Sequence, residues 1–185
     1  MKPYFKNFKF YGVNALALFP YNEKLKQMIY LLKGCKDYEM RECLFKMFRI
    51  ELKIKYRNYN LVCAPSYATK DKERGFNHVE AIFSQLNLPI LNILEKNKDV
   101  NQHNLNFHKR KNIDEVIKLK DDFSSIDGKK ILLVDDIMTT GGTMKRCLEL
   151  VKSQRPKKIK ILVLAKRELS KEEKEVYKKE ALDYI

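Results

Sequence analysis

Two kinds of hydrophobic pattern alternate along the chain. Short segments that are almost wholly apolar lie at residues 60–64, 90–94, 131–134 and 159–165. Between them, apolar residues recur every three or four positions, as they do on one face of an amphipathic helix. Strands without outward-facing polar residues are typical of a parallel sheet that helices cover on both faces. The pattern therefore predicts an α/β fold.

The helical spacing predicts helices at residues 22–34, 38–56, 78–86 and 143–153. Asn22 is a favourable N-cap for the first helix, and Gly34 is a favourable end. On the longest helix, the spacing predicts a core-facing side made of Leu44, Met47, Phe48 and Ile54. Residues 4–19 are expected to form short extended pieces and 116–119 a weak strand, while 66–77 and 95–112 are polar and predict loops.

We expect one compact domain with three parts. Residues 1–58 form a small N-terminal hood or helical segment, 59–167 the α/β core, and 168–185 a charged tail with a surface helix. No apolar run approaches the roughly 20 residues that cross a bilayer, and the N-terminus lacks the pattern of a signal peptide. These features predict a cytoplasmic protein without a membrane span.

Charge and cysteine content narrow the class of function. The formal net charge of +14 favours polyanionic partners such as nucleic acid or phosphorylated ligands. Lysines spread over solvated surfaces explain most of this charge. The four cysteines show no C-x-x-C spacing, which argues against a zinc site or a disulfide framework. We therefore expect Cys63 and Cys147 to be small core residues.

The segment from Asp135 to Thr143 combines groups suited to a phosphorylated sugar. Its glycine pair at 141–142 lets backbone N–H groups turn toward an anion at a helix N-terminus. Its three threonines add hydroxyl donors. The adjacent carboxylates of Asp135 and Asp136 would repel phosphate, so they are expected to face sugar hydroxyls or a Mg²⁺ ion shared with the ligand.

Residues Val134 to Thr143 closely resemble the motif that binds 5-phosphoribosyl-1-pyrophosphate (PRPP) in the phosphoribosyltransferase (PRT) fold. In that motif, two acids hold the ribose hydroxyls and the T-T-G-G-T loop holds the 5′-phosphate. The resemblance implies a type I PRT-like parallel sheet flanked by helices, with Asp135 and Asp136 as catalytic residues. It implies PRPP contacts from Asp135, Asp136, Met138, Thr139, Thr140, Gly141, Gly142 and Thr143.

Further segments resemble the ComF-type, competence-associated phosphoribosyltransferases. Ala64–Ser66 and Glu73–Asn77 are similar to the P-x-P and R-G-F-N segments of that family, and Lys33–Asp37 to its K-x-x-G-D segment. Gln102 and Arg110 are similar to its Q-x-x-L…R…N stretch. The chain departs from the family in lacking the cysteine-rich zinc module of longer members. Together the similarities cover most of residues 15–165.

The resemblance implies a set of pyrophosphate-binding or loop residues: Pro65, Ser66, Arg74, Lys96, Lys98 and Arg110. The planar fork of Arg74 suits phosphate oxygens, although the same side chain is also suited to bracing the loop. No side chain is assigned to a metal, because the implied Mg²⁺ is carried by PRPP. His78, at the start of a helix, is the histidine expected closest to the site.

The implied reaction transfers ribose 5-phosphate from PRPP to a nucleobase-like acceptor and releases pyrophosphate. Two alternatives stay open. One is a non-catalytic protein that senses PRPP or binds single-stranded DNA or competence proteins. DNA bases would then stack on the aromatic side chains of Lys2–Tyr11. We prefer the interpretation that these aromatic side chains pack inward from an edge strand. The other is adenine-like base salvage. Thr139 stands where enzymes of 6-oxopurine salvage usually carry an acid. The sequence leaves the acceptor, the general base and the oligomeric state undetermined.

Overall fold

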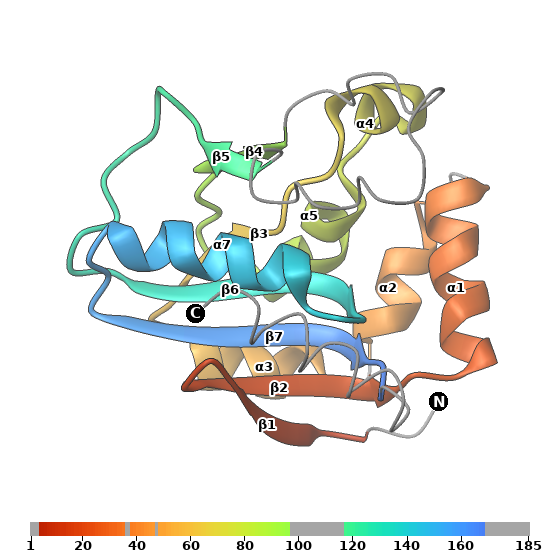
Figure 1. The fold of residues 1–185 in the computed structure, drawn as a ribbon. Coiled ribbons are helices and arrows are strands. Elements are labelled where there is room, and N and C mark those ends of the chain that lie inside the picture. Colours follow the sequence, from red (N-terminus) through yellow and green to blue (C-terminus); the bar gives the residue numbers. More distant parts are fainter. Residues whose placement is uncertain (1–3, 36–37, 47, 97–116, 169–185) are drawn as a thin grey trace, which may run out of the picture.

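A computed structural model of the protein describes residues 4–35, 38–46, 48–96 and 117–168 (Figure 1). Its main sheet has the strand order β1-β2-β7-β6-β3. The strands are β1 Lys6–Phe10, β2 Val13–Pro20, β3 Asn60–Cys63, β6 Lys130–Met138 and β7 Lys158–Lys166. Strands β2, β7, β6 and β3 pair in parallel, while β1 runs antiparallel to β2 at one edge. The predicted parallel α/β sheet is therefore present, with an antiparallel edge strand added.

Helices cover both faces of this sheet (Figure 1). One hydrophobic cluster lies under α1 Glu23–Gly34, α2 Met40–Phe45, α3 Arg49–Tyr56, α5 His78–Phe83 and the 3₁₀ turn Ser84–Leu86. The other lies under α7 Gly142–Ser153. Successive residues of β6 alternate between the two, since Leu132 belongs to the first cluster and Leu133 to the second. Burial on both faces explains why these strands are continuously apolar.

The first helix forms as its sequence predicts. The Asn22 side chain accepts a hydrogen bond from the Leu25 N–H at 3.0 Å, which satisfies one free donor at the N-terminus of α1.

The extended pieces expected in 4–19 are β1 and β2, joined at Tyr11 and Gly12. Strand β2 belongs to the N-terminal segment 1–58 but pairs with β7 of the core sheet. A boundary at residue 58 therefore separates β2 from the sheet to which it belongs.

The single helix predicted for 38–56 is wrong. The chain forms α2 and α3 instead, with a break near Phe48, whose ring packs edge-on or tilted against Phe5, Phe19 and Phe45. The break turns the second half of the segment, so that Leu52 faces the core and Ile54 is 63% exposed. Met47 lies outside the described residues.

Three predictions near the strand ends also need correction. The segment 66–77 is not only a loop, because it contains α4 Ala68–Arg74. The strand expected at 90–94 is reduced to a single bridge from Ile90 to Leu61, and pairing resumes as the short antiparallel pair of β4 Leu94–Lys96 and β5 Ile117–Leu119. Strand β6 continues past Val134 to Met138, because its ladder with β7 continues to that point. Both acids of the motif therefore lie in a strand.

Several predictions concern parts of the chain beyond the described ranges. These are most of the loop at 95–112 and the tail helix after residue 168. None of the helices in the described part has the length and apolar composition of a membrane span.

Candidate functional site

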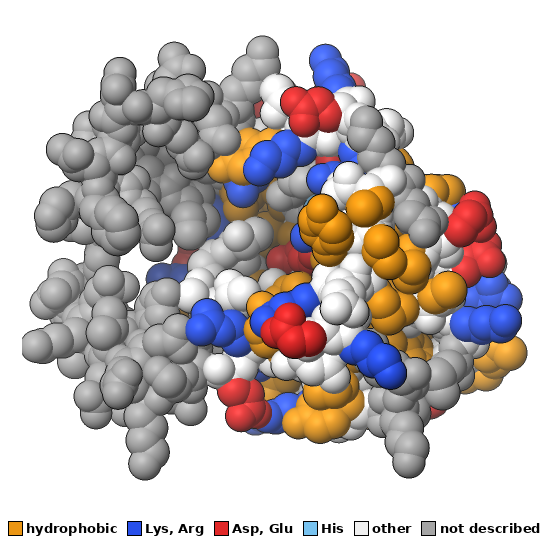
Figure 2. Space-filling view, turned by 90° about the vertical axis from the view of Figure 1, so that its right-hand side faces the viewer, with side chains coloured by type: hydrophobic (Ala, Val, Ile, Leu, Met, Phe, Trp, Pro, Cys, Tyr) orange, Lys and Arg blue, Asp and Glu red, His pale blue; other side chains and the backbone are white. Residues whose placement is uncertain are grey.

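A cavity of about 370 Å³ lies at the carboxyl ends of β3 and β6, between the end of α1 and the segment that carries α4. In a parallel sheet this edge is where ligands bind. Seven predicted site residues line the cavity: Pro65, Ser66, Arg74, Lys96, Asp135, Asp136 and Thr143. Lys33, Tyr67, Lys70 and His78 line it as well. On the face that carries α1 and α4, Lys and Arg side chains surround a recess with acidic side chains at its centre (Figure 2).

The two acids are oriented by the backbone of β6. The Asp136 N–H donates to Asp135 Oδ1 at 2.8 Å, and the Ile137 N–H donates to Asp136 Oδ1 at 2.7 Å. Each carboxyl group thus has one oxygen held by the following amide. This fixes the direction of both side chains and leaves the second oxygen of each for other partners.

Asp136 is stabilised in its ionised form. Burial by itself raises the pKa of this carboxyl, but the adjacent imidazole of His78 and the positive charge of Lys33 outweigh it, and the net pKa lies below the ordinary value. Lys33 forms an ion pair with Asp136 Oδ2, and His78 Nε2 lies 3.5 Å from the same oxygen.

Asp135 has the opposite tendency. Burial raises the pKa of its carboxyl well above the ordinary value, and the negative charge of Asp136 raises it further. The neighbouring carboxyls therefore differ, one favouring the protonated form and the other the ionised form. A pair of this kind offers both a donor and an acceptor to two adjacent hydroxyl groups.

His78 connects Asp136 to Arg74. Arg74 Nη1 lies 3.2 Å from His78 Nδ1, and an arginine can only donate, so Nδ1 must be the acceptor. The ring proton is then on Nε2, which faces Asp136. Burial lowers the pKa of His78, which keeps the ring neutral at pH 7 and supports this tautomer.

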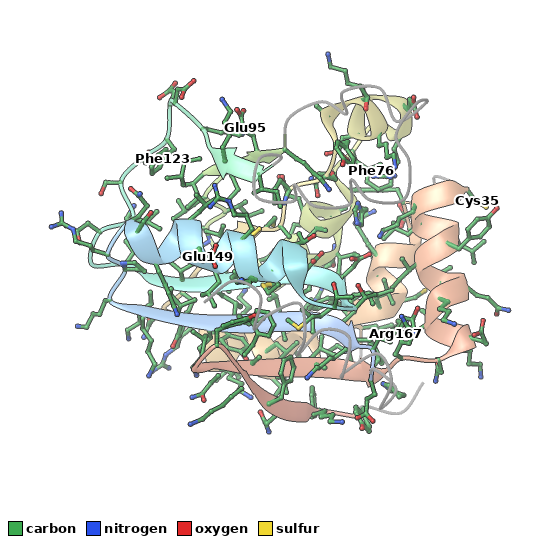
Figure 3. The ribbon with its side chains drawn as sticks, viewed as in Figure 1. Cys35, Phe76, Glu95, Phe123, Glu149 and Arg167 are labelled. Atoms are coloured by element: carbon green, nitrogen blue, oxygen red, sulfur yellow. The ribbon has the colours of Figure 1, made fainter. Side chains whose placement is uncertain are left out.

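Arg74 braces the site. Its Nε donates to the Lys33 carbonyl oxygen at 3.1 Å, and its Nη1 donates to Asp71 Oδ1 at 3.2 Å. Asp71 also accepts from the Ser66 hydroxyl and the Asn77 amide, which ties the loop after β3 to the start of α5. Nearby, Phe76 lies below α4 on the side of α1 (Figure 3), with its ring centre 5.0 Å from that of Tyr38. Contact between Arg74 and pyrophosphate stays a prediction.

The glycine–threonine loop connects β6 to α7. Gly141 is the N-cap of α7 and has a φ of +87°, a value that residues other than glycine rarely adopt. A Cβ at Gly141 would also lie 2.7 Å from the Phe10 ring of β1. Thr139 and Thr140 are exposed, and the Gly142 N–H lies 3.5 Å from Thr140 Oγ1. The exposed hydroxyl-bearing side chains of Thr139 and Thr140 therefore lie beside the N-terminus of α7, where an anion is favoured.

The side chain of Met138 does not line the cavity, and a PRPP contact from this residue stays a prediction. It is 2% exposed and packs in the cluster under α7 with Met144, so it does not reach the cavity. Strict alternation along β6 would place Met138 on the same face as Asp136, but at the end of the strand its side chain packs in the cluster under α7 instead.

The cations of the cavity come from separate elements. Lys96 of β4 and Lys70 of α4 lie 4.0 Å and 5.4 Å from the centre of the Tyr67 ring. Lys98 and Arg110 fall outside the described residues. Within the described part of the chain, no three His, Cys, Asp or Glu side chains are placed to hold a metal ion.

Sequence reasoning assigned no role to Lys33 and none with confidence to His78. Lys33 is in the last turn of a helix about 100 residues before Asp136 along the chain, and nothing local indicates that its ammonium reaches the acids. The similarity of Lys33–Asp37 to a family segment was the only available signal.

Comparison with known proteins identifies the family. Residues 72–185 match the family described as "Phosphoribosyl transferase domain". The chain is 31% identical over 155 residues to "Competence protein ComFC" of Streptococcus pneumoniae, covering 84% of this chain and 69% of that protein. It is 33% identical over 101 residues to an adenine phosphoribosyltransferase of Campylobacter jejuni, covering 54% of this chain and 53%, about half, of the relative.

Among solved structures, a hypoxanthine phosphoribosyltransferase from Staphylococcus aureus aligns with a TM-score of 0.44 and 18% identity, covering 72% of this chain and 76% of that one. The family match spans more than half of the chain, and the competence relative is matched over most of its length. The chain therefore belongs to the phosphoribosyltransferase family, and within it to the ComF type.

Proposed function

We propose that this protein binds PRPP with Mg²⁺ in the cavity beside β3 and β6 and transfers its ribose 5-phosphate to a nucleobase-like acceptor. The observation that carries this proposal is the carboxyl pair Asp135 and Asp136, held with opposite protonation tendencies beside the N-terminus of α7. A vicinal diol next to a phosphate matches that arrangement, and PRPP contains both.

The two ends of the ligand would be held by different forces. The 5′-phosphate would accept hydrogen bonds from the backbone and hydroxyl groups of residues 139–143, where the helix dipole of α7 favours an anion. The ribose 2′- and 3′-hydroxyls would bond to Asp135 and Asp136. These two anchors place the C1′ atom and the pyrophosphate toward Lys33, Lys70 and Lys96.

In the transfer, the bond between C1′ and the pyrophosphate oxygen breaks and a bond from C1′ to an acceptor nitrogen forms. The ribose carries positive charge in the transition state, as in glycoside cleavage. The ionised Asp136 stabilises that charge, while the lysines stabilise the charge that develops on the pyrophosphate. No described residue is assigned as a base for the acceptor.

The donor set fits a Mg²⁺ ion that arrives with the ligand. Asp136 already has a cationic partner in Lys33, and the described side chains form no cage of their own. Magnesium prefers oxygen ligands and keeps several waters, so the pyrophosphate would supply most of its contacts. When bound, the ion would neutralise the negative charge of the leaving pyrophosphate.

The two alternatives differ in their support. The name of the Streptococcus relative favours a link to DNA uptake, which we propose as the biological setting in the cytoplasm. DNA stacking on the N-terminal segment gains little support, because Phe5, Phe8 and Phe10 pack against the core, although Tyr4 and Tyr11 are exposed. Adenine salvage is favoured only by the partial match to the Campylobacter enzyme.

Calorimetric titration of PRPP with Mg²⁺ tests the proposal directly. Wild type should bind saturably, and the double variant Asp135→Asn, Asp136→Asn should lose binding while remaining folded by circular dichroism. The matched control is Asp127→Asn, an exposed acid paired with Arg155 far from the cavity, which should bind like wild type. Pyrophosphate release measured over a panel of bases then identifies the acceptor. A folded wild type that shows no heat of binding would rule out the proposal.

A further inference from the structure

The oxygen Asp136 Oδ2 has Lys33 and His78 as neighbours but no hydrogen bond of regular geometry. Lys33 forms an ion pair with it, and His78 Nε2 lies 3.5 Å away. Among the residues that the structure describes, it is the one fully buried side-chain oxygen or nitrogen without a hydrogen-bond partner. Lys33 and His78 supply its contacts in the free protein, so a ligand donor that reaches this buried oxygen would have to replace one of them.

The two neighbours differ in their freedom to move. The imidazole of His78 is buried and held from behind by Arg74. The side chain of Lys33 is 34% exposed, lines the cavity and extends from the last turn of α1. Its backbone is fixed, because its carbonyl oxygen accepts the hydrogen bond from Arg74 Nε. Lys33 therefore has a fixed backbone and a flexible four-carbon side chain that can turn within the cavity.

The charge balance of the cavity would change when an anionic ligand enters. Without ligand, Lys33 is the ammonium paired with the ionised acid, while Arg74 is paired with Asp71 and the other two lysines lie against Tyr67. A ribose hydroxyl that donates to Asp136 Oδ2 satisfies this oxygen without a cation. A pyrophosphate that enters with the ribose brings several negative charges to the same space, and a nearby ammonium interacts strongly with them at low dielectric.

We infer that Lys33 is a ligand-responsive cation that pairs with Asp136 in the free protein and moves to the pyrophosphate of PRPP when a ribose hydroxyl takes its place. This inference rests on the proposed function, because it assigns a specificity role within the same PRPP site. The exchange forms and breaks no covalent bond and transfers no proton. It makes Lys33 one of the residues that distinguish PRPP from ribose phosphates that lack the pyrophosphate.

Two ligands separate this role from simple support of Asp136. PRPP with Mg²⁺ and ribose 5-phosphate share the sugar hydroxyls and the 5′-phosphate, but only PRPP carries pyrophosphate. Both are titrated calorimetrically into wild type, Lys33→Met, Lys33→Arg and Lys26→Met. The last variant is the matched control, since Lys26 is on the same helix in an exposed pair with Glu23, away from the cavity. Thermal unfolding of each variant establishes that it is folded.

Lys33→Met is expected to weaken PRPP binding by about 10- to 100-fold, the effect of losing one charge-assisted hydrogen bond. Its affinity for ribose 5-phosphate should stay within about threefold of wild type or increase, because the competing cation is gone. Lys33→Arg should retain more PRPP affinity than Lys33→Met, and Lys26→Met should match wild type. Equal losses for both ligands, or no loss for either, would overturn the role of Lys33 while leaving the proposed function standing. A folded wild type that binds neither ligand would overturn both.

Discussion

The neighbouring carboxyls of Asp135 and Asp136 are expected to respond in opposite directions to the same substitution, aspartate to asparagine. Asparagine keeps the oxygen that accepts the following backbone N–H in each case, so local geometry is preserved and only the charge is removed. The prediction concerns the free energy of unfolding without ligand. It follows from the directions of the two pKa shifts.

For Asp135 the pKa is raised on folding, chiefly by burial and then by repulsion from Asp136. Below the pKa of the unfolded chain both states are protonated and the group has no effect. As the pH rises above that value, the unfolded chain ionises first, and folding stability is lost until the folded pKa is passed. Removing a buried charge that repels Asp136 should therefore make Asp135→Asn more stable than wild type at pH 7, within the range common for stabilising substitutions, about 0.5–2 kcal/mol.

For Asp136 the pKa is lowered on folding, because His78 and Lys33 together outweigh burial. Its contribution to stability is present above the unfolded pKa and is lost as the pH falls through the folded pKa. Removing one partner of a fully buried ion pair costs about 3–5 kcal/mol. Lys33 is one-third exposed and can turn toward solvent, which screens the loss, so Asp136→Asn should destabilise the protein by about 1–3 kcal/mol.

Urea unfolding at pH 7 and near pH 4 measures both effects. The gain from Asp135→Asn should be largest at pH 7 and shrink toward pH 4, where the wild-type carboxyl is protonated in the folded state and only about half ionised in the unfolded chain. At roughly 2–4 °C per kcal/mol, thermal unfolding should show the same signs. Asp127→Asn serves as the surface control. If both variants destabilise the protein, or if the gain from Asp135→Asn is as large at pH 4 as at pH 7, the assignment of opposite protonation tendencies is wrong.

Three further predictions concern the same site. Gly141→Ala should lower the free energy of unfolding by about 1–3 kcal/mol in urea, because of the positive φ and the contact with Phe10. Adding Phe10→Ala to the same chain should recover part of this loss but not all. His78→Gln retains a donor toward Asp136 and should keep the PRPP affinity measured by calorimetry within roughly threefold of wild type. His78→Leu should lose about tenfold in the same assay. Equal affinities of the two variants would show that His78 does not position the acid. Chelation of Mg²⁺ by EDTA should abolish most PRPP binding while leaving the unfolding temperature of the free protein unchanged, and a drop in that temperature would indicate a metal held by the protein itself.

The sequence by itself determined the features that depend on residues close together in the chain. The apolar run at 131–134 and the spacing of 143–153 define β6 and α7 because burial on both faces or on one helical face leaves a local periodicity. The segment Asp135–Thr143 identifies the ligand class because its acids, glycines and threonines are consecutive. Asn22 likewise marks the start of α1, since capping is a contact across three residues.

Only the tertiary structure decided which distant residues meet these acids. The ion pair of Lys33 with Asp136 and the placement of His78 between Asp136 and Arg74 arise where the end of α1, the start of α5 and the end of β6 converge. The split of the predicted helix at Phe48 has the same origin, because its ring packs on aromatics from β1, β2 and α2. Burial and charge at a site are sums over neighbours from all elements, so the opposite pKa shifts of two adjacent, chemically identical aspartates leave no mark in the local sequence.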